Sequence, residues 1–187
     1  MSDILVVDDH PIIATACRIV LEPMGVEEII SASTADAGYQ VFVEREPDVS
    51  VIDLSLHGEE MAGISLIKRI RSYKADARIL VFSMRSDRKS FFSAIEAGTT
   101  GYAIKDSPAD EFTKAVEKTR LGRRYIDPQL ALNLAFSKNA ALSPREQRII
   151  NLLLKDSPRT GGAQFTDPRS LSAARPHASY AGLKATF

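Results

Sequence analysis

The sequence has little of several features that mark particular protein classes. Its 187 residues include one cysteine, Cys17, and no tryptophan. A single cysteine excludes a disulfide framework or a multi-cysteine metal site within the chain. Basic and acidic residues balance at 24 each, so the net charge favours neither nucleic acid nor a membrane surface as a partner. No apolar run approaches the roughly 18 residues of a membrane span and no signal peptide is recognisable, so we expect a cytoplasmic protein.

Apolar runs alternate with helical patterns over the first part of the chain. The runs predict five buried strands, at residues 4–7, 26–32, 49–53, 78–83 and 101–105. Apolar residues recur at helical spacing between them, and Pro11, Thr34 and Pro108 suit helix starts. Such alternation is typical of a parallel sheet with helices on both faces. The sequence therefore predicts an α/β fold with a doubly wound five-stranded parallel sheet.

Polar side chains stand where these apolar runs stop. Asp8 and Asp9 follow the first strand, and Asp53 ends the third. Ser83 ends the fourth strand and Lys105 the fifth. In a doubly wound sheet, ligands bind beyond the carboxyl ends of the strands, so we expect these side chains to meet. Any one of these residues alone would more often be a surface residue or a helix cap. The five together indicate a functional site far more specifically than any single one does.

The chemistry of this set points to phosphoryl groups. Three carboxylates at one place repel one another unless a cation neutralises them. Oxygen ligands without histidine or cysteine suit Mg²⁺, which keeps several waters and commonly bridges to phosphate. Lys105 adds a positive charge for phosphoryl oxygens, and the Ser83 hydroxyl adds a donor. The pattern predicts phosphoryl transfer to an aspartate nucleophile, with Mg²⁺ as the cofactor.

Four segments at the strand ends combine into a recognisable set of motifs. They read Val-Val-Asp8-Asp9-His-Pro, Val-Ile-Asp53-Leu, Val-Phe-Ser83 and Gly-Tyr102-Ala-Ile-Lys105-Asp. In order and spacing they resemble the CheY-like receiver domains of two-component response regulators. The last segment, with Gly-Arg-Arg-Tyr-Ile-Asp-Pro128 after it, is similar to the NarL/FixJ, or LuxR-type, branch. The resemblance covers residues 3 to about 156.

The resemblance implies how the phosphoryl group would be received. Asp53 would take it from a phosphohistidine of a sensor histidine kinase. Asp9 would bind Mg²⁺ directly, Asp8 mainly through water, and Ser55 through its backbone carbonyl. The protein would catalyse its own phosphorylation and slow dephosphorylation and would not be an enzyme in the usual sense.

The resemblance also implies a switch. Ser83 would hydrogen-bond one phosphoryl oxygen and Lys105 would pair with another. Tyr102 would be the aromatic residue that turns inward when Ser83 moves. Phosphorylation adds nearly two negative charges, and an energy gap of a few kcal/mol between two conformations would suffice for switching.

The loop after Asp53 departs from the family pattern. The family usually has proline at the position of His57 and a glycine about two residues earlier than Gly63. This loop therefore counts two extra residues beside the predicted phosphorylation site, and we expect altered kinase choice or dephosphorylation rate. A loop histidine is usually solvated, so we do not expect His57 to carry a phosphoryl group.

The C-terminal part divides at a change of composition. We predict a receiver domain at 1–121, a partly helical linker at 122–141 and, at 142–156, the first helix of a LuxR-type DNA-binding domain. Ser143 is a good N-cap for that helix, with Pro144 at its first position and Glu146 three residues after the cap. Residues 157–187 lose helical periodicity, so we expect a disordered tail and a truncated or frameshifted output domain. These residues show no pattern for the scaffold and recognition helices of a helix-turn-helix, so we expect weak or no specific DNA binding, although the family binds DNA.

Three functions stay open at the sequence level. The first is a regulator of transcription whose output domain is damaged, with a sensor histidine kinase and DNA as family partners and a homodimer as a further candidate. The second is a stand-alone receiver that relays or drains phosphate or acts through protein contacts. The third is a Mg²⁺-dependent phosphatase, which would prefer Asp-x-Asp after the first strand where this chain has Asp8-Asp9. A dinucleotide-binding fold is weaker still, because no glycine-rich fingerprint follows that strand.

Overall fold

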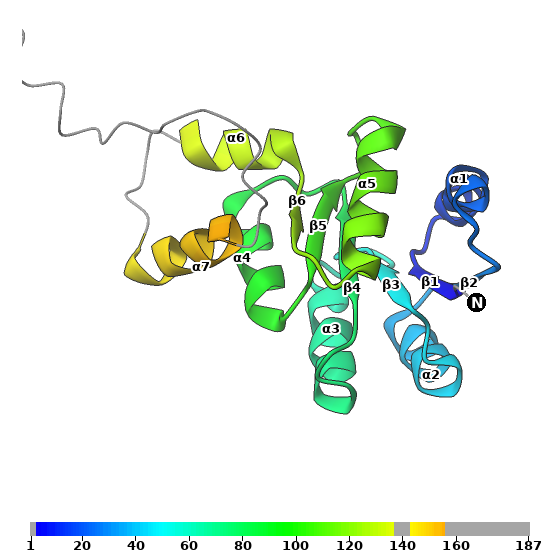
Figure 1. The fold of residues 1–187 in the computed structure, drawn as a ribbon. Helices are drawn as coiled ribbons and strands as arrows, with labels where there is room; N and C mark the ends of the chain where they lie inside the picture. Colours follow the sequence, from blue (N-terminus) through cyan, green and yellow to red (C-terminus); the bar gives the residue numbers. More distant parts are fainter. Residues whose placement is uncertain (1–2, 137–142, 156–187) are drawn as a thin grey trace, which may run out of the picture. The chain divides into compact units, whose positions relative to one another are not determined.

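A computed structural model describes residues 3–136 and 143–155 (Figure 1). Its centre is a parallel six-stranded sheet in the order β2-β1-β3-β4-β5-β6. The strands are β1 (Asp3–Val7), β2 (Glu28–Ala32), β3 (Val49–Ile52), β4 (Ile79–Ser83), β5 (Gly101–Ile104) and β6 (Tyr125–Ile126). The predicted α/β class and doubly wound parallel sheet are confirmed.

Helices follow each of the first five strands and cover both faces of the sheet (Figure 1). They are α1 (Pro11–Leu21), continued by the short 3-10 helix η1 (Glu22–Met24), then α2 (Ala35–Arg45), α3 (Ala62–Tyr73), α4 (Arg88–Ala97) and α5 (Ala109–Arg120). Beyond β6 come α6 (Pro128–Phe136) and α7 (Pro144–Lys155). Within the described residues, no helix is long and apolar enough to cross a membrane.

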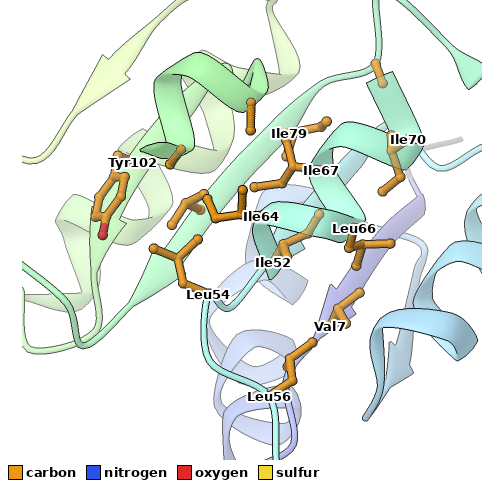
Figure 2. Packing of buried hydrophobic residues seen from close by; sticks show 14 of the residues in the cluster. Val7, Ile52, Leu54, Leu56, Ile64, Leu66, Ile67, Ile70, Ile79 and Tyr102 are labelled. Carbon is orange, nitrogen blue, oxygen red and sulfur yellow. The ribbon is translucent and has the colours of Figure 1, made fainter. Parts of the chain in front are cut away.

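The core is split by the sheet into two apolar layers. Strand β1 shows the division, because Leu5 and Val7 face the layer under α2, α3 and α4, while Ile4 and Val6 face the layer under α1 and α5. Figure 2 shows the larger layer, where Ile52 of β3 packs among side chains of α3. A strand buried on both faces needs apolar residues at every position, which explains why the strands appear in the sequence as continuous runs.

The sheet has one strand more than the sequence predicts. The two residues of β6 pair with β5 in parallel, Tyr125 beside Gly101 and Ile126 beside Tyr102. Tyr125 is buried, and its hydroxyl donates to Glu111 of α5 at 2.7 Å. The count of five strands therefore differs from the structure by one, because a two-residue strand has no periodicity for the sequence to display.

Several helix starts follow their predicted chemistry. Thr34 caps α2, its hydroxyl accepting from the Ala37 N–H at 3.1 Å. At α7, the Ser143 hydroxyl accepts from the Glu146 N–H at 3.3 Å, and the Glu146 carboxylate accepts from the Ser143 N–H at 2.8 Å. This reciprocal pair is a capping box, as predicted for the helix that opens the C-terminal part. The predicted tail at 157–187 lies outside the described residues.

Candidate phosphoacceptor site

The carboxyl ends of the central strands bring the candidate residues together. Strands β1 and β3 are neighbours, and the chain leaves them in opposite directions across the sheet. This is a topological switch point, where doubly wound sheets bind ligands. Asp8 directly follows β1, Asp53 directly follows β3, and Lys105 directly follows β5. The backbone fixes the first two against each other, because the Asp53 N–H donates to the Val7 carbonyl at 2.9 Å.

Asp53, Lys105 and Asp8 form a buried ion-paired group. Lys105 Nζ lies 2.7 Å from Asp53 Oδ2 and 2.5 Å from Asp8 Oδ2, and all three side chains are at most 6% exposed. Burial lowers the pKa of the Lys105 ammonium, but its hydrogen bonds to Asp53 and Asp8 raise that pKa by more. The net pKa lies above the ordinary value for lysine, so one positive charge persists between two carboxylates.

Asp9 brings a third carboxylate to this group. Ligand atoms of Asp8, Asp9, His10 and Asp53 all lie within 4.8 Å of one another. Burial raises the pKa of the Asp9 carboxyl, but the His57 backbone N–H and the nearby imidazoles lower it by more, so the carboxyl is ionised at neutral pH. Its Oδ1 atom is buried and, among the described residues, accepts no hydrogen bond. The His10 Nδ1 atom lies 3.1 Å from this oxygen without making a hydrogen bond to it. A surplus of carboxylates fits an oxygen-coordinated divalent cation.

Gly63 supports the position of Asp53 from behind. A Cβ atom at Gly63 would lie 2.0 Å from the Asp53 carbonyl oxygen and 2.8 Å from the Leu54 Cα. The Gly63 N–H also donates to the Leu54 carbonyl at 3.1 Å. Because both close contacts are with backbone, any larger residue would push α3 away from the end of β3. Gly63, which stands about two residues later than the glycine usual in the family, therefore allows α3 to pack directly against the backbone of Asp53.

The two serines at the strand ends both contact Arg85, Ser55 through the guanidinium and Ser83 through the backbone N–H. The Ser55 N–H donates to Asp53 Oδ1 at 3.4 Å, and its hydroxyl accepts from Arg85 Nε at 3.2 Å. Ser83 is buried at the end of β4, and its hydroxyl accepts from the Arg85 N–H at 3.5 Å. Arg85 also pairs with Glu60 at 2.7 Å, so it spans from the β4 end to the loop after β3.

Tyr102 lies inside the larger core layer and not in the carboxylate group. Its ring is fully buried in this layer (Figure 2). It meets Phe91 of α4 edge to face, with 5.6 Å between the ring centroids. The hydroxyl donates to the Arg85 carbonyl at 2.7 Å. Burial raises the pKa of this phenol, so it stays a donor. The ring already points inward in this structure, and its predicted role in switching stays a prediction.

Comparison with known proteins decides the family. The family model of the response regulator receiver domain matches residues 4–117, which includes every element from β1 to most of α5. The chain belongs to the response regulator family. It shares 33% identity over 157 residues with the methanol utilization control regulatory protein MoxX of Paracoccus denitrificans, covering 80% of this chain and 70% of MoxX.

A solved structure at 34% identity places this response regulator in the LuxR-type branch. A LuxR-family two-component response regulator from Aurantimonas sp. SI85-9A1 matches with a TM-score of 0.69 and 34% identity, over 75% of this chain and 99% of the other. A response regulator of Burkholderia pseudomallei shares the fold, with a TM-score of 0.58, 21% identity and coverage of 83% and 85%. That crystal structure carries a phosphorylated aspartic acid, a calcium ion and citrate.

Two contacts of this receiver were not predicted from the sequence. The His57 backbone N–H donates to Asp9 Oδ2 at 2.9 Å, with His57 at φ 52°. The proline usual at this position could neither donate that bond nor adopt that φ. The second contact is the bridge from Arg85 to Glu60, an acidic residue of the lengthened loop. A two-residue difference in loop length was the only signal for both contacts, and it does not say what the loop touches.

Proposed function

We propose that Asp53 accepts a phosphoryl group and that this receiver thereby acts as the input domain of a two-component phosphorelay. The observation that carries the proposal is the geometry of Asp53, almost fully buried, paired with Lys105, and beside Asp8 and Asp9. The phosphorylated aspartic acid in the Burkholderia neighbour supports the same chemistry by analogy of fold.

The transfer step needs one bond made and one bond broken. An Asp53 carboxylate oxygen attacks the phosphorus of a phosphohistidine on a sensor histidine kinase. The new O–P bond forms as the P–N bond breaks, and the electron pair of that bond stays on the histidine nitrogen. Lys105, held at Asp53 by a 2.7 Å contact, is placed to exchange that contact for a phosphoryl oxygen. The Ser83 hydroxyl is proposed to donate to another.

Mg²⁺ is the proposed cofactor. Asp9 would hold it directly, Asp8 mainly through water, and Asp53 and the Ser55 carbonyl would complete the protein ligands. When bound, the cation neutralises the charge that develops on the transferring phosphoryl oxygens. The surplus of carboxylates at Asp8, Asp9 and Asp53 supports this assignment.

The proposed switch couples Ser83 to Tyr102 through Arg85. The Arg85 N–H contacts the Ser83 hydroxyl, and the Arg85 carbonyl accepts from the Tyr102 hydroxyl. Movement of Ser83 toward a phosphoryl group would shift Arg85, whose carbonyl accepts the hydrogen bond of the Tyr102 hydroxyl. The conformation of the surface formed by α4 and β5 would then change. Phosphorylation at Asp53 would in this way alter a surface that partners can bind.

The proposed partners are a sensor histidine kinase and, for the branch, DNA. Helix α7 carries the capping box predicted for the opening helix of a LuxR-type domain. A recognition helix in the major groove is what gives such domains sequence specificity, and the sequence from 157 onward shows no pattern for one. We propose that this chain binds promoter DNA weakly or without specificity, which a gel shift with labelled duplexes would test. A homodimer and a stand-alone relay role stay open.

Mass spectrometry tests the phosphoacceptor directly. The full chain is incubated with acetyl phosphate and Mg²⁺, beside the Asp53→Asn and Asp106→Asn variants. Asp106 is a matched control, because it is an exposed carboxylate one residue after Lys105. Wild type and Asp106→Asn should gain one phosphoryl group, and Asp53→Asn should gain none. Equal labelling of Asp53→Asn would refute the assignment, and turnover of a generic phosphate ester would favour the phosphatase reading instead.

A further inference from the structure

A buried carboxylate outside the pocket holds the turn that carries Lys105. Residues 104–107 form this turn, which is closed by a hydrogen bond from the Ser107 N–H to the Ile104 carbonyl at 3.1 Å. Asp127 directly follows β6 and is only 1% exposed. Its Oδ2 atom accepts from the Ser107 hydroxyl at 2.6 Å and from the Ile104 N–H at 3.5 Å. One carboxylate oxygen therefore contacts both ends of the turn.

The other oxygen of Asp127 caps the linker helix α6. Oδ1 accepts from the Gln129 N–H at 2.9 Å and from the Leu130 N–H at 3.4 Å, and the Asp127 carbonyl accepts from the Ala131 N–H at 2.9 Å. Leu130 is fully buried in the larger core layer. Because α6 has only nine residues, its order depends on this cap and on packing. The start of α6 thus depends on the same carboxylate that holds the turn.

Lys105 has to move if it is to exchange its contact with Asp53 for one with a phosphoryl oxygen. The ends of its turn can then follow only by pulling on Asp127 or by releasing it. We propose that Asp127 is a positioning residue that couples the turn of Lys105 to α6, so that α6 loosens when Asp53 is phosphorylated. The response to phosphorylation rests on the proposed function, whereas the link between the turn and α6 does not.

This coupling leads to a different element from the proposed switch at Tyr102. The switch runs from Ser83 through Arg85 to the surface of α4 and β5. The contacts of Asp127 run from the end of β5 to α6, the helix that precedes the C-terminal part of the chain. Each polar group that meets a phosphoryl oxygen would then act on its own output element.

Hydrogen–deuterium exchange of the full chain, with and without acetyl phosphate and Mg²⁺, tests the coupling. Ser107→Ala removes the shortest bond between the turn and Asp127 and leaves the cap of α6 in place. Thr113→Ala is the matched control, because its hydroxyl donates to the Asp110 carbonyl within α5 at 2.8 Å. Weakening a cap changes helix opening about fivefold, so phosphorylation should speed α6 exchange about fivefold in wild type and in Thr113→Ala. Ser107→Ala should gain the phosphoryl group normally, with an increase in exchange below about twofold.

Lys105→Met tests the same link without phosphate, because it frees the turn from Asp53 and Asp8. It should speed α6 exchange by itself, and adding Ser107→Ala should remove that increase. An effect of Lys105→Met that is absent, or that persists with Ser107→Ala, would overturn the proposal.

Three further outcomes would also overturn it. They are unchanged α6 exchange in the phosphorylated chain, a full increase in Ser107→Ala, and fast exchange of Ser107→Ala in both states, which would make the bond merely structural. If no chain gains a phosphoryl group but the effect of Lys105→Met requires Ser107, the coupling stands and the proposed phosphoacceptor function fails.

Discussion

Charged side chains gather at both ends of the strands of this sheet, and the two sets of charges are paired differently. We call the end where the strands finish the carboxyl edge, and the end where they begin the opposite edge. At the carboxyl edge, Asp8 and Asp53 share the ammonium of Lys105, and Asp9 lies beside them as a third carboxylate. At the opposite edge, charges are matched one to one or bound to backbone. Lys74 pairs with Glu46 at 2.8 Å, and the Arg71 guanidinium donates to the carbonyls of Ala75 and Gly98, both at 2.5 Å.

The difference separates structural charges from charges kept for a ligand. At the opposite edge most of these polar groups are paired, although the buried Arg71 Nε has no hydrogen-bond partner among the described residues, so we expect its residues to act mainly on stability. An edge with surplus carboxylates costs stability until a cation arrives, which is typical of functional sites. Substitutions at the two edges should therefore separate into those that change stability and those that change phosphorylation.

Gly63→Ala is the change expected to affect both properties, and to have the largest effect. Its added methyl would meet backbone atoms of Asp53 and Leu54, so α3 must move. We expect the free energy of unfolding to fall by about 3 kcal/mol or more in urea titration, together with a loss of phosphorylation. Gly122→Ala is the control, because it has a positive φ of 69° and no atom nearby. It should cost only about 1 to 2 kcal/mol, and an equal cost for both would contradict this account.

Arg71→Ala should affect stability alone. The guanidinium ties the loop after α3 to the end of α4, and each lost charged hydrogen bond leaves a carbonyl without its donor. We expect a loss of about 2 kcal/mol in the free energy of unfolding. Phosphoryl labelling by acetyl phosphate should match that of wild type when both are measured below the unfolding transition. A labelling defect in this folded variant would mean that the two edges are not independent.

Asp87→Ala should have the smallest effect and a pH signature. Asp87 caps α4, accepting from the Ser90 N–H at 2.9 Å and the Ser90 hydroxyl at 2.7 Å. Burial raises the pKa of Asp87, but these hydrogen bonds lower it by more, so its net pKa lies below the ordinary value. The cap should contribute about 1 kcal/mol above pH 4, and this contribution is lost as pH falls through the folded pKa.

The control for that prediction is Thr34→Ala, the neutral cap of α2. Its cost should also be about 1 kcal/mol and should not change with pH. Denaturation of both variants between pH 3 and pH 7 gives the comparison. Parallel pH curves for the two variants would show that Asp87 does not act through its charge, although it lies at the same edge of the sheet as Asp8 and Asp53.

Much of the fold was predictable because burial on both faces leaves a direct trace in the sequence. The apolar runs gave five strands to within two residues at each end, and their order along the chain implied a parallel sheet. The capping box of Ser143 and Glu146 was predictable because it is local. Strand β6 was not, because Tyr125 and Ile126 become a strand only through pairing with β5.

The candidate site was predictable as a set of residue types but not as a set of contacts. Asp8, Asp53 and Lys105 stand at strand ends, so topology alone brings them together. The bond from His57 to Asp9 spans 48 positions in the sequence and depends on the φ angle of a loop residue. The bridge from Arg85 to Glu60 likewise depends on where a lengthened loop folds back. Such contacts follow from tertiary placement, which a single sequence does not encode in any local pattern.

Urea unfolding with and without Mg²⁺ tests the central claim most directly, namely that the carboxyl edge holds a surplus of charge for a cation. At a Mg²⁺ concentration about 100 times its dissociation constant, the full chain should gain about 2.7 kcal/mol of stability. Asp106→Asn should gain as much, whereas Asp9→Asn should gain little and should be no less stable than wild type without Mg²⁺. An undiminished Mg²⁺ effect in Asp9→Asn would contradict the account.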